Sequence, residues 1–453
     1  MEYYKKALHI ALPMMIQNGI TNLVNMLDNI MVGSIGTDPM SGVAIVNQLL
    51  FIWNLCIFGG LSGISIFSAQ FHGKKDERGV RYTFRLMFML ALILTVTGLL
   101  VFSTSHMKLF AIYLHEDTAG AAETVRYAKQ YILFMLWGLL PFALTQVYSS
   151  SLRATGETRL PMQGSLIAVF LNLAGNYILI FGHFGLPAMG VRGAALATII
   201  SRFAELFYLV YMTHKDPEGH PYINGAYSSM HVPSQLVKSC AIKGTPLLVN
   251  EALWSAGIAA ITGIYSYRGL SVVAALNICQ TLSNVFSIAF LAMGGAIGII
   301  IGQELGAGRF DEVRENANRL SMFAVMLSVV MGALMFLFSS VFPQLYNTTD
   351  EVRTLAVSFI RIMALIMPVN AYANSAYFTI RSGGKTLITF LSDSCFGWFI
   401  SIPIAFVLVH FTSLPIVRIY FCVQTAEILK CIIGYILVQK GIWINDITLS
   451  TGG

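Results

Sequence analysis

Charge is the scarcest property of this sequence. Asp, Glu, Lys and Arg together make up 11% of its 453 residues, whereas a soluble domain usually carries about 25%. Hydrophobic residues make up 56%, so the chain has too few polar groups to cover a water-exposed surface. This composition excludes an ordinary soluble protein and predicts that lipid surrounds most of the molecule.

The sequence also lacks the motifs of metal and redox centres. Its six cysteines are scattered through apolar runs without a CxxC pair, which favours a packing role over metal or disulfide chemistry. Its nine histidines form no HExxH motif or cluster. These absences argue against an integral membrane enzyme, and no cofactor is expected.

Long hydrophobic runs recur along the whole chain, and each is long enough to cross a bilayer as a helix of about 20 residues. We place twelve spans, at residues 8–32, 43–71, 82–104, 124–151, 161–184, 188–212, 240–266, 275–302, 318–340, 353–380, 387–411 and 415–439. The sequence therefore predicts an all-α integral membrane protein with twelve transmembrane helices.

The distribution of basic residues predicts the orientation. Eighteen of the 28 Lys and Arg residues fall in the two termini and in the loops that join an even-numbered span to the next odd-numbered one. Seven fall in the loops on the other side of the membrane. Because positive charge collects on the cytoplasmic side, we expect a multi-pass protein of the cell membrane with both termini in the cytoplasm. The net charge of +6 then follows from topology, and no nucleic-acid partner is expected.

Two short motifs recur in the same order in the two halves. Residues 70–75 near the second span match 303–308 near the eighth, and residues 152–158 match 380–386 at nearly the same separation. We therefore expect an N-lobe (1–212) and a C-lobe (240–440) of six helices each, a cytoplasmic linker (213–239) and a C-terminal tail (441–453). An even number of helices per repeat places the pseudo-twofold axis along the membrane normal, a design that suits alternating access better than a channel.

The first span carries an unusual polar stripe. Its members are Gln17, Asn18, Thr21, Asn22, Asn25, Asp28 and Asn29. At 100° per residue they fall within an arc of about 140°, so this face points to the protein interior or a water-filled cavity. Amides can simply join helices, but an intramembrane carboxylate is costly, and Asp28 is predicted to be functional. We expect Gln17, Asn18, Asn22 and Asn25 to line an N-lobe cavity.

Other spans carry smaller polar sets. Asn172 and Asn176 lie one turn apart in the fifth span. In the C-lobe we expect a cavity lined by Glu251, Gln280, Asn284, Asn370, Asn374 and Tyr377. Two local charge pairs, Arg202 with Glu205 and Glu427 with Lys430, are interpreted as structural neutralisation. Asp393, near the start of the eleventh span, occupies a helix end that favours a carboxylate.

At this point the pattern resembles the MATE family, the multidrug and toxic compound extrusion transporters, of the bacterial type. The resemblance rests on residues 25–33 around Asp28, with Pro13 upstream, and on the Gln-x-x-Gly patterns at 70 and 303. It also rests on residues 152–158, close to the family's LRATGDT, and on residues 193–198, which match its GAAxAT. The similarity extends over essentially the whole chain.

The resemblance implies roles for individual residues. Asp28 matches the acid that the family uses in cation coupling, and Asn172, Asn176 and Thr198 match positions that join it. Their carboxylate, amide and hydroxyl oxygens suit Na⁺, and the carboxylate can instead take up a proton. Either cation, by neutralising the site, is expected to release or bend the first span near Pro13, the expected hinge.

In the C-lobe, the resemblance assigns a functional glutamate to Glu251. One branch of the family also has an acid in the tenth span, where this chain has Asn370. This departure makes a second cation site doubtful.

We expect a Na⁺- or H⁺-coupled antiporter that exports organic, cationic or amphipathic compounds by alternating access. Its partners are the lipid bilayer and small organic substrates, and the chain is expected to be monomeric. The alternatives are a flippase for lipid-linked saccharides, an integral membrane enzyme and a channel. A flippase of this kind carries extra helices and a more basic central cavity, neither of which the sequence indicates.

Overall fold

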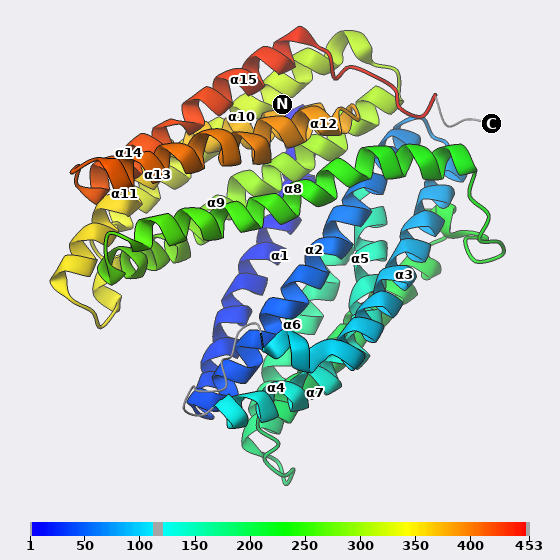
Figure 1. Cartoon of the computed structure of the whole chain (residues 1–453). Helices are drawn as coiled ribbons and strands as arrows, with labels where there is room; N and C mark the ends of the chain where they lie inside the picture. Colours follow the sequence, from blue (N-terminus) through cyan, green and yellow to red (C-terminus); the bar gives the residue numbers. More distant parts are fainter. Residues whose placement is uncertain (1, 112–120, 450–453) are drawn as a thin grey trace. The chain divides into compact units, whose positions relative to one another are not determined.

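The computed structural model describes residues 2–111 and 121–449, and all regular structure in these ranges is helical (Figure 1). The first half contains α1 (Glu2–Gly33), α2 (Thr37–Gly73), α3 (Glu77–Phe110), α4 (Ala121–Met135), η1 (Leu136–Gly138), α5 (Leu139–Ala154), α6 (Arg159–Phe181) and α7 (Val191–Lys215). After η2 (Pro221–Ile223), the second half contains α8 (Ser234–Ser266), α9 (Leu270–Gly306), α10 (Phe310–Phe338), η3 (Phe342–Leu345), α11 (Asp350–Ser382), α12 (Thr386–Phe390), η4 (Leu391–Cys395), η5 (Gly397–Ser401), α13 (Ile402–Phe411), α14 (Ile416–Thr425) and α15 (Glu427–Lys440).

Each of the twelve expected spans corresponds to one of these helices or to consecutive helical segments. Eleven spans in the described ranges have the length and apolar composition needed to cross a membrane. α1 has the length, 32 residues, but its polar stripe lowers its hydropathy. Together with α1, these spans confirm the predicted all-α membrane fold.

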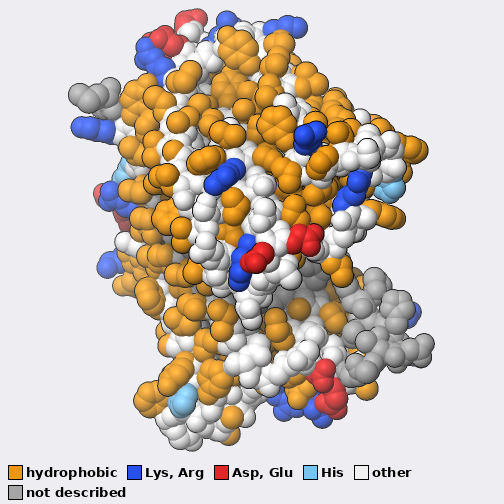
Figure 2. All heavy atoms as spheres, turned by 90° about the vertical axis from the view of Figure 1, so that its left-hand side faces the viewer, with side chains coloured by type: hydrophobic (Ala, Val, Ile, Leu, Met, Phe, Trp, Pro, Cys, Tyr) orange, Lys and Arg blue, Asp and Glu red, His pale blue; other side chains and the backbone are white. Residues whose placement is uncertain are grey.

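The outer surface is consistent with a lipid environment. Figure 2 shows a face on which hydrophobic side chains predominate. Large apolar side chains such as Phe170, Leu337 and Phe399 are 65%, 71% and 79% exposed. A soluble monomer rarely shows so much apolar surface, whereas acyl chains cover it without cost.

The chain forms two compact units whose bounds differ from the expected lobes. One unit comprises Ile16–Ser68 and Asp76–Val237, and the other comprises Met1–Met15, Ala69–Lys75 and Lys238–Gly453. The start of α1 and the end of α2 therefore group with the C-terminal half. We refer to the units as the N-lobe and the C-lobe with these bounds.

The first turns of α1 are anchored within the C-lobe. Ala7, Ile10 and Ala11 are buried in one apolar cluster with residues of α9. The hydroxyl of Tyr3 donates to the Glu304 carboxylate, which also accepts from Asn316 Nδ2 at 3.1 and 3.2 Å. Beyond Met15 the same helix belongs to the N-lobe. Pro13, which has no N–H for the helix ladder, lies two residues before this boundary.

The expected linker is packed against the N-lobe. Arg85 of α3 donates to the carbonyls of Gly225 and Ala226, both at 2.8 Å. The Tyr227 ring packs edge-on against Phe84 at 6.0 Å. The segment between α7 and α8 is thus tied to the N-lobe by charge-assisted hydrogen bonds and aromatic contacts.

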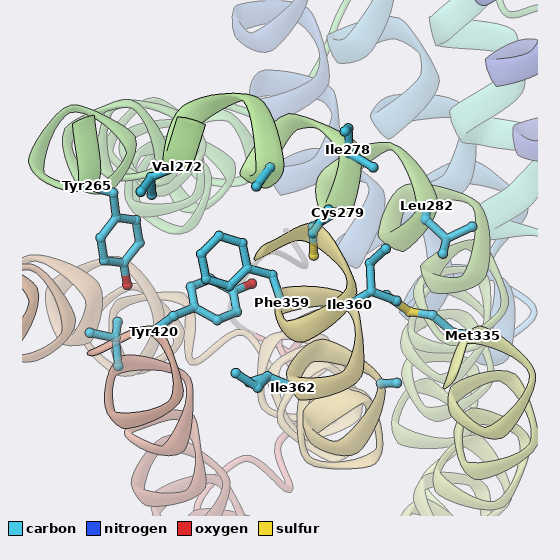
Figure 3. Packing of buried hydrophobic residues seen from close by; sticks show 14 of the residues in the cluster. Tyr265, Val272, Ile278, Cys279, Leu282, Met335, Phe359, Ile360, Ile362 and Tyr420 are labelled. Atoms are coloured by element: carbon cyan, nitrogen blue, oxygen red, sulfur yellow. The ribbon is translucent and has the colours of Figure 1, made fainter. Parts of the chain in front are cut away.

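A cluster of buried hydrophobic residues lies in the core of the C-lobe, and three of its members are linked by aromatic contacts (Figure 3). The Phe359 ring of α11 lies 4.6 Å from Tyr420 of α14, and Tyr420 lies 6.0 Å from Tyr265 of α8. All three side chains are buried. Their packing joins three helices that are far apart in the sequence.

The ends of α2 and α9 cross at a pair of glycines that the sequence repeat relates to each other. A Cβ on Gly73 would lie 1.9 Å from the Gln303 carbonyl oxygen, and one on Gly306 would lie 1.9 Å from that of Gln70. The two helices therefore approach so closely that neither position has room for a side chain. The reciprocal contact is the structural counterpart of the repeated Gln-x-x-Gly motif.

The C-terminal tail packs onto this crossing through Asn445 and Ile447. Gln70 Nε2 donates to the carbonyls of Ser382 at 2.9 Å and Asn445 at 3.2 Å. Its Oε1 accepts from the Ile447 N–H at 2.9 Å. Trp443 and Ile447 are buried, so the tail is a structural part of the C-lobe. The expected tail residues 450–453 lie outside the described residues.

The topology can be tested at the two ends of α2. Ser34 lies just before this helix and Glu77 just after it, and both are exposed. In a variant without native cysteines, we expect Ser34→Cys to react with an impermeant thiol reagent added outside intact cells. Glu77→Cys is expected to react only after permeabilisation, because one membrane-spanning helix separates the two positions. The opposite labelling pattern would contradict the orientation inferred from the basic loops.

The glycine crossing predicts a specific stability defect. Gly73→Ala is expected to lower the stability of the purified protein by about 1–3 kcal/mol or more, because the methyl group meets backbone atoms that cannot rotate away. Gly263→Ala is the matched control, since an added Cβ there meets nothing within 4 Å. Thermal unfolding in detergent measures both; equal melting temperatures for the two variants would contradict this account.

Candidate functional site: two polar cavities

The N-lobe contains a polar cavity of about 350 Å³. We call it the N-lobe cavity; its lining residues are Gln17, Asn18, Thr21, Val24, Asn25, Asp28, Phe58, Phe142, Gln146, Arg153, Ser165, Ala168, Val169, Asn172, Thr198, Ser201, Arg202 and Glu205. The polar stripe of α1 forms one wall of this cavity, as the stripe predicted. Asn22 is exposed and is not among the lining residues.

Three residues that the sequence singled out, Asp28, Asn172 and Thr198, line this cavity, and the fourth, Asn176, is buried and bonds two of them. Asn176 Nδ2 donates to Asp28 Oδ1 and lies 3.3 Å from Asn172 Oδ1. Asn172 Nδ2 in turn donates to Thr198 Oγ1 at 3.2 Å. A connected set of a carboxylate, two amides and a hydroxyl therefore joins α1, α6 and α7.

Small residues between α6 and α7 allow this set to assemble. A Cβ on Gly193 would lie 2.5 Å from the Leu179 carbonyl oxygen, and one on Gly175 would lie 2.9 Å from Ala197 Cβ. The two backbones are therefore in close contact, which brings Thr198 within hydrogen-bond distance of Asn172. The small residues of the GAALAT segment (193–198) thus serve helix packing.

The oxygen atoms of this set fit a hard monovalent cation. Asn176 is completely buried, and its Oδ1 has no hydrogen-bond partner in the structure. A buried oxygen without a partner is costly, and a cation can satisfy it. Carboxylate, amide and hydroxyl oxygens are the ligand types that hard cations prefer.

The cavity also contains a polar network that sequence reasoning missed. Arg153 Nη2 donates to Gln17 Oε1 at 2.9 Å, and Gln17 Nε2 donates to Ser165 Oγ at 2.6 Å. Ser165 Oγ donates to Glu205 Oε1, also at 2.6 Å. This series of bonds links α5, α1, α6 and α7 and brings an arginine of the 152–158 motif into the cavity.

Arg202 and Glu205, the local pair expected from spacing, both line the cavity but form no direct ion pair in the described residues. Arg202 Nη1 instead donates to the Gly138 carbonyl at 3.0 Å, and its guanidinium lies 4.9 Å from the centre of the Phe142 ring. The i,i+3 spacing indicated proximity, but partners on other helices determine which bonds form.

The C-lobe contains a second cavity, of about 510 Å³. We call it the C-lobe cavity; its lining residues are Asn250, Glu251, Trp254, Ile258, Phe290, Leu291, Met363, Asn370, Ala373, Asn374, Tyr377, Phe378, Arg381, Asp393, Gln424, Glu427 and Lys430. Four of the six expected residues are present: Glu251, Asn370, Asn374 and Tyr377. Gln280 and Asn284 are exposed, bond each other at 3.0 Å and are not in this lining.

The polar side chains of the C-lobe cavity form an ion network. Lys430 of α15 is paired with Asp393 and lies 3.7 Å from Glu427. Asp393 belongs to a π-helical segment, η4, a wide turn that often marks functional sites. Asn250 of α8 donates to Asp393 Oδ2 at 3.0 Å. The predicted pair of Glu427 and Lys430 is therefore confirmed as one part of a larger network.

Two polar cavities within twelve transmembrane helices define a membrane transporter. The chain belongs to the MatE family, whose model matches residues 13–178 and again 246–407. The two matches begin at the same separation as the Gln70 and Gln303 motifs, which confirms the internal repeat. Membership also confirms that the chain is a transporter and not an enzyme.

Curated relatives and a solved structure agree with this assignment. The chain is 27% identical over 452 residues to the probable multidrug resistance protein NorM of Thermotoga maritima, covering 98% of this chain and 93% of that protein. It is 25% identical over 418 residues to the probable multidrug resistance protein YoeA of Bacillus subtilis, covering 90% and 87%. A MATE transporter of Vibrio cholerae superimposes with a TM-score of 0.84 at 18% identity, covering 97% of each chain.

Proposed function

We propose that this chain is a cation-coupled antiporter that exports organic, cationic or amphipathic compounds by alternating access. The observation that carries the proposal is the N-lobe set of Asp28, Asn172, Asn176 and Thr198. The relatives' printed names, multidrug resistance proteins, favour an organic cargo. Under this proposal the chain acts as a monomer in the cell membrane with both termini in the cytoplasm.

Coupling follows from the cost of a buried charge. Asp28 sits among amides, so its negative charge is poorly solvated, and a cation that neutralises it changes the energy of the surrounding helices. A cation and a cargo that favour opposite conformations of one bistable protein then exchange across the membrane. Na⁺ would be held by the oxygens of the four residues, whereas a proton would reside on the Asp28 carboxylate.

α1 is the element through which binding acts on the rest of the protein. Its first turns are anchored in the C-lobe by Tyr3, Ala7 and Ile10, and Asp28 belongs to the N-lobe. The helix passes from one unit to the other next to Pro13, where the backbone ladder lacks a donor. We propose Pro13 as the hinge that lets α1 respond to neutralisation of Asp28.

The charge of the C-lobe cavity favours a cationic cargo. Its lining contains the carboxylates of Glu251, Asp393 and Glu427 but only two basic groups, Arg381 and Lys430. Complementary charge attracts organic cations, and it opposes the anionic pyrophosphate of a lipid-linked saccharide. The balance therefore favours the efflux antiporter over the flippase.

The decisive test is Asp28→Asn, which keeps the size of the side chain and removes its charge. We expect folded protein whose gradient-driven transport in proteoliposomes falls by at least about tenfold, because a permanently neutral site has no differential cation affinity left. The exposed acid Asp311 provides a matched control: Asp311→Asn is expected to transport normally. Full transport by Asp28→Asn under an imposed Na⁺ or H⁺ gradient would exclude Asp28 from the mechanism.

A substitution at Glu251 tests the binding of cargo separately from the coupling to a cation. Within the described residues its carboxylate makes no ion pair, so it is available to a ligand. Glu251→Gln is expected to weaken binding of cationic compounds by about two- to tenfold, the range of a partly exposed charge pair. Equilibrium binding in detergent measures the effect, with exposed Glu351→Gln as the control; unchanged binding would assign Glu251 a structural role only.

A further inference from the structure

The C-lobe cavity already contains a cation of its own. Lys430 extends from α15 into the lining and pairs with Asp393 Oδ1, and both side chains are largely buried, at 21% and 17% exposure. In the bilayer such a pair neutralises a carboxylate that would otherwise be costly. The lysine therefore occupies a carboxylate that would also attract the positive group of a ligand.

The geometry prepares Asp393 for an exchange of partners. Asn250 Nδ2 holds its other oxygen, Oδ2, at 3.0 Å. The Asn250 amide oxygen and backbone carbonyl accept from Ser394 Oγ at 2.6 and 2.9 Å. The neighbouring helix α8 thus holds one oxygen of the carboxylate, while the other, Oδ1, bonds Lys430.

Lys430 also has a second acceptor close by. Glu427, one helical turn earlier on α15, lies 3.7 Å from the Lys430 ammonium. A small rotation of the lysine side chain would transfer the ammonium from Asp393 to Glu427. The move leaves the lysine paired, so it avoids the large penalty of an isolated buried charge.

The rest of the lining suits a cation that carries aromatic rings. Trp254, Phe290, Tyr377 and Phe378 contribute aromatic surface. The Arg381 guanidinium lies 5.3 Å from the centre of the Phe378 ring and 5.9 Å from that of Tyr377. These rings already contact one cation face-on, which is the interaction that recognises organic ammonium groups.

We propose that Lys430 is a tethered competitor for organic cations in the C-lobe cavity. In the absence of cargo its ammonium is paired with the Asp393 carboxylate. An aromatic ammonium or iminium compound binds Asp393 Oδ1 while the Lys430 ammonium moves to Glu427. When the cargo leaves, the ammonium pairs with Asp393 again. The inference rests on the proposed function only in taking the cargo as cationic; it adds Asp393 to Glu251 as a charge partner of the cargo and assigns the group that displaces the cargo.

The exchange predicts that removing the lysine strengthens binding. Lys430→Met keeps the length of the side chain and removes its charge. We expect the full-length protein in detergent to bind ethidium, a permanent aromatic cation, at least about tenfold more tightly than wild type. Asp393→Asn is expected to bind it at least about tenfold more weakly, and Lys430→Arg to remain close to wild type. Fluorescence anisotropy at constant pH and salt measures all four affinities.

A purely structural ion pair predicts a different pattern. Lys430→Met would then unfold at a lower temperature but bind ethidium no better than wild type, and that result in folded protein overturns the proposal. Phenanthridine, the neutral core of the probe, controls for shape, since its binding is expected to be the same in wild type and Lys430→Met. Equal strengthening for both compounds would also overturn it, because a change of cavity shape would then explain the gain.

A second variant decides the question if Lys430→Met does not fold. Glu427→Gln keeps the pair of Lys430 and Asp393 but removes the acceptor to which the lysine transfers. We expect weaker ethidium binding, and unchanged binding overturns the proposal. If wild-type protein binds no ethidium, the cationic cargo and this inference both fail; if wild type binds and Lys430→Met does not tighten binding, only this inference fails.

Discussion

The cost of burying charge in a lipid-surrounded protein is the constraint on which this structure depends. Asp28, Glu205 and Asp393 each lie within a transmembrane unit, and each has a hydrogen-bonding or charged partner on another helix. The partner differs in each case: an amide, a hydroxyl and an ammonium. Since each carboxylate is bonded to another helix, any change in its charge acts on helix packing as well as on ligand binding.

The two lobes correspond to one repeat, but the buried charges of their cavities are neutralised in different ways. The N-lobe cavity contains two acids and two arginines, and Asp28 is surrounded by neutral amides. The C-lobe cavity has an excess of carboxylates and a lysine that is paired with Asp393 and lies 3.7 Å from Glu427. This divergence is consistent with separate tasks, cation coupling in the N-lobe and cargo selection in the C-lobe. At Gly73 and Gly306, where the repeat keeps the same residue in both halves, its role is helix packing.

Sequence reasoning succeeded where one helix determines the outcome. The period of the α1 stripe predicted that Gln17, Asn18, Asn25 and Asp28 share a cavity, because positions on a single rigid helix follow from 100° per residue. Asn22, Gln280 and Asn284 are not among the lining residues of either cavity. These residues lie on polar faces of their helices, but the sequence carries no information on how far a lining extends around each helix.

The sequence by itself determined the membrane class, the number of helices, the repeat and, by resemblance, the family. These properties depend on composition and on local periods, which a single chain displays directly. Only the tertiary structure decided the partners of the charged groups: Arg153 reaches Gln17, and Lys430 pairs with Asp393 37 residues away. Spacing along one helix had suggested Glu205 as the partner of Arg202, and it identified only Glu427 of the two acids near Lys430. In a medium of low dielectric constant, a charge pairs with whichever group helix packing brings within a few ångströms, and packing depends on the small residues and crossing points of the whole fold.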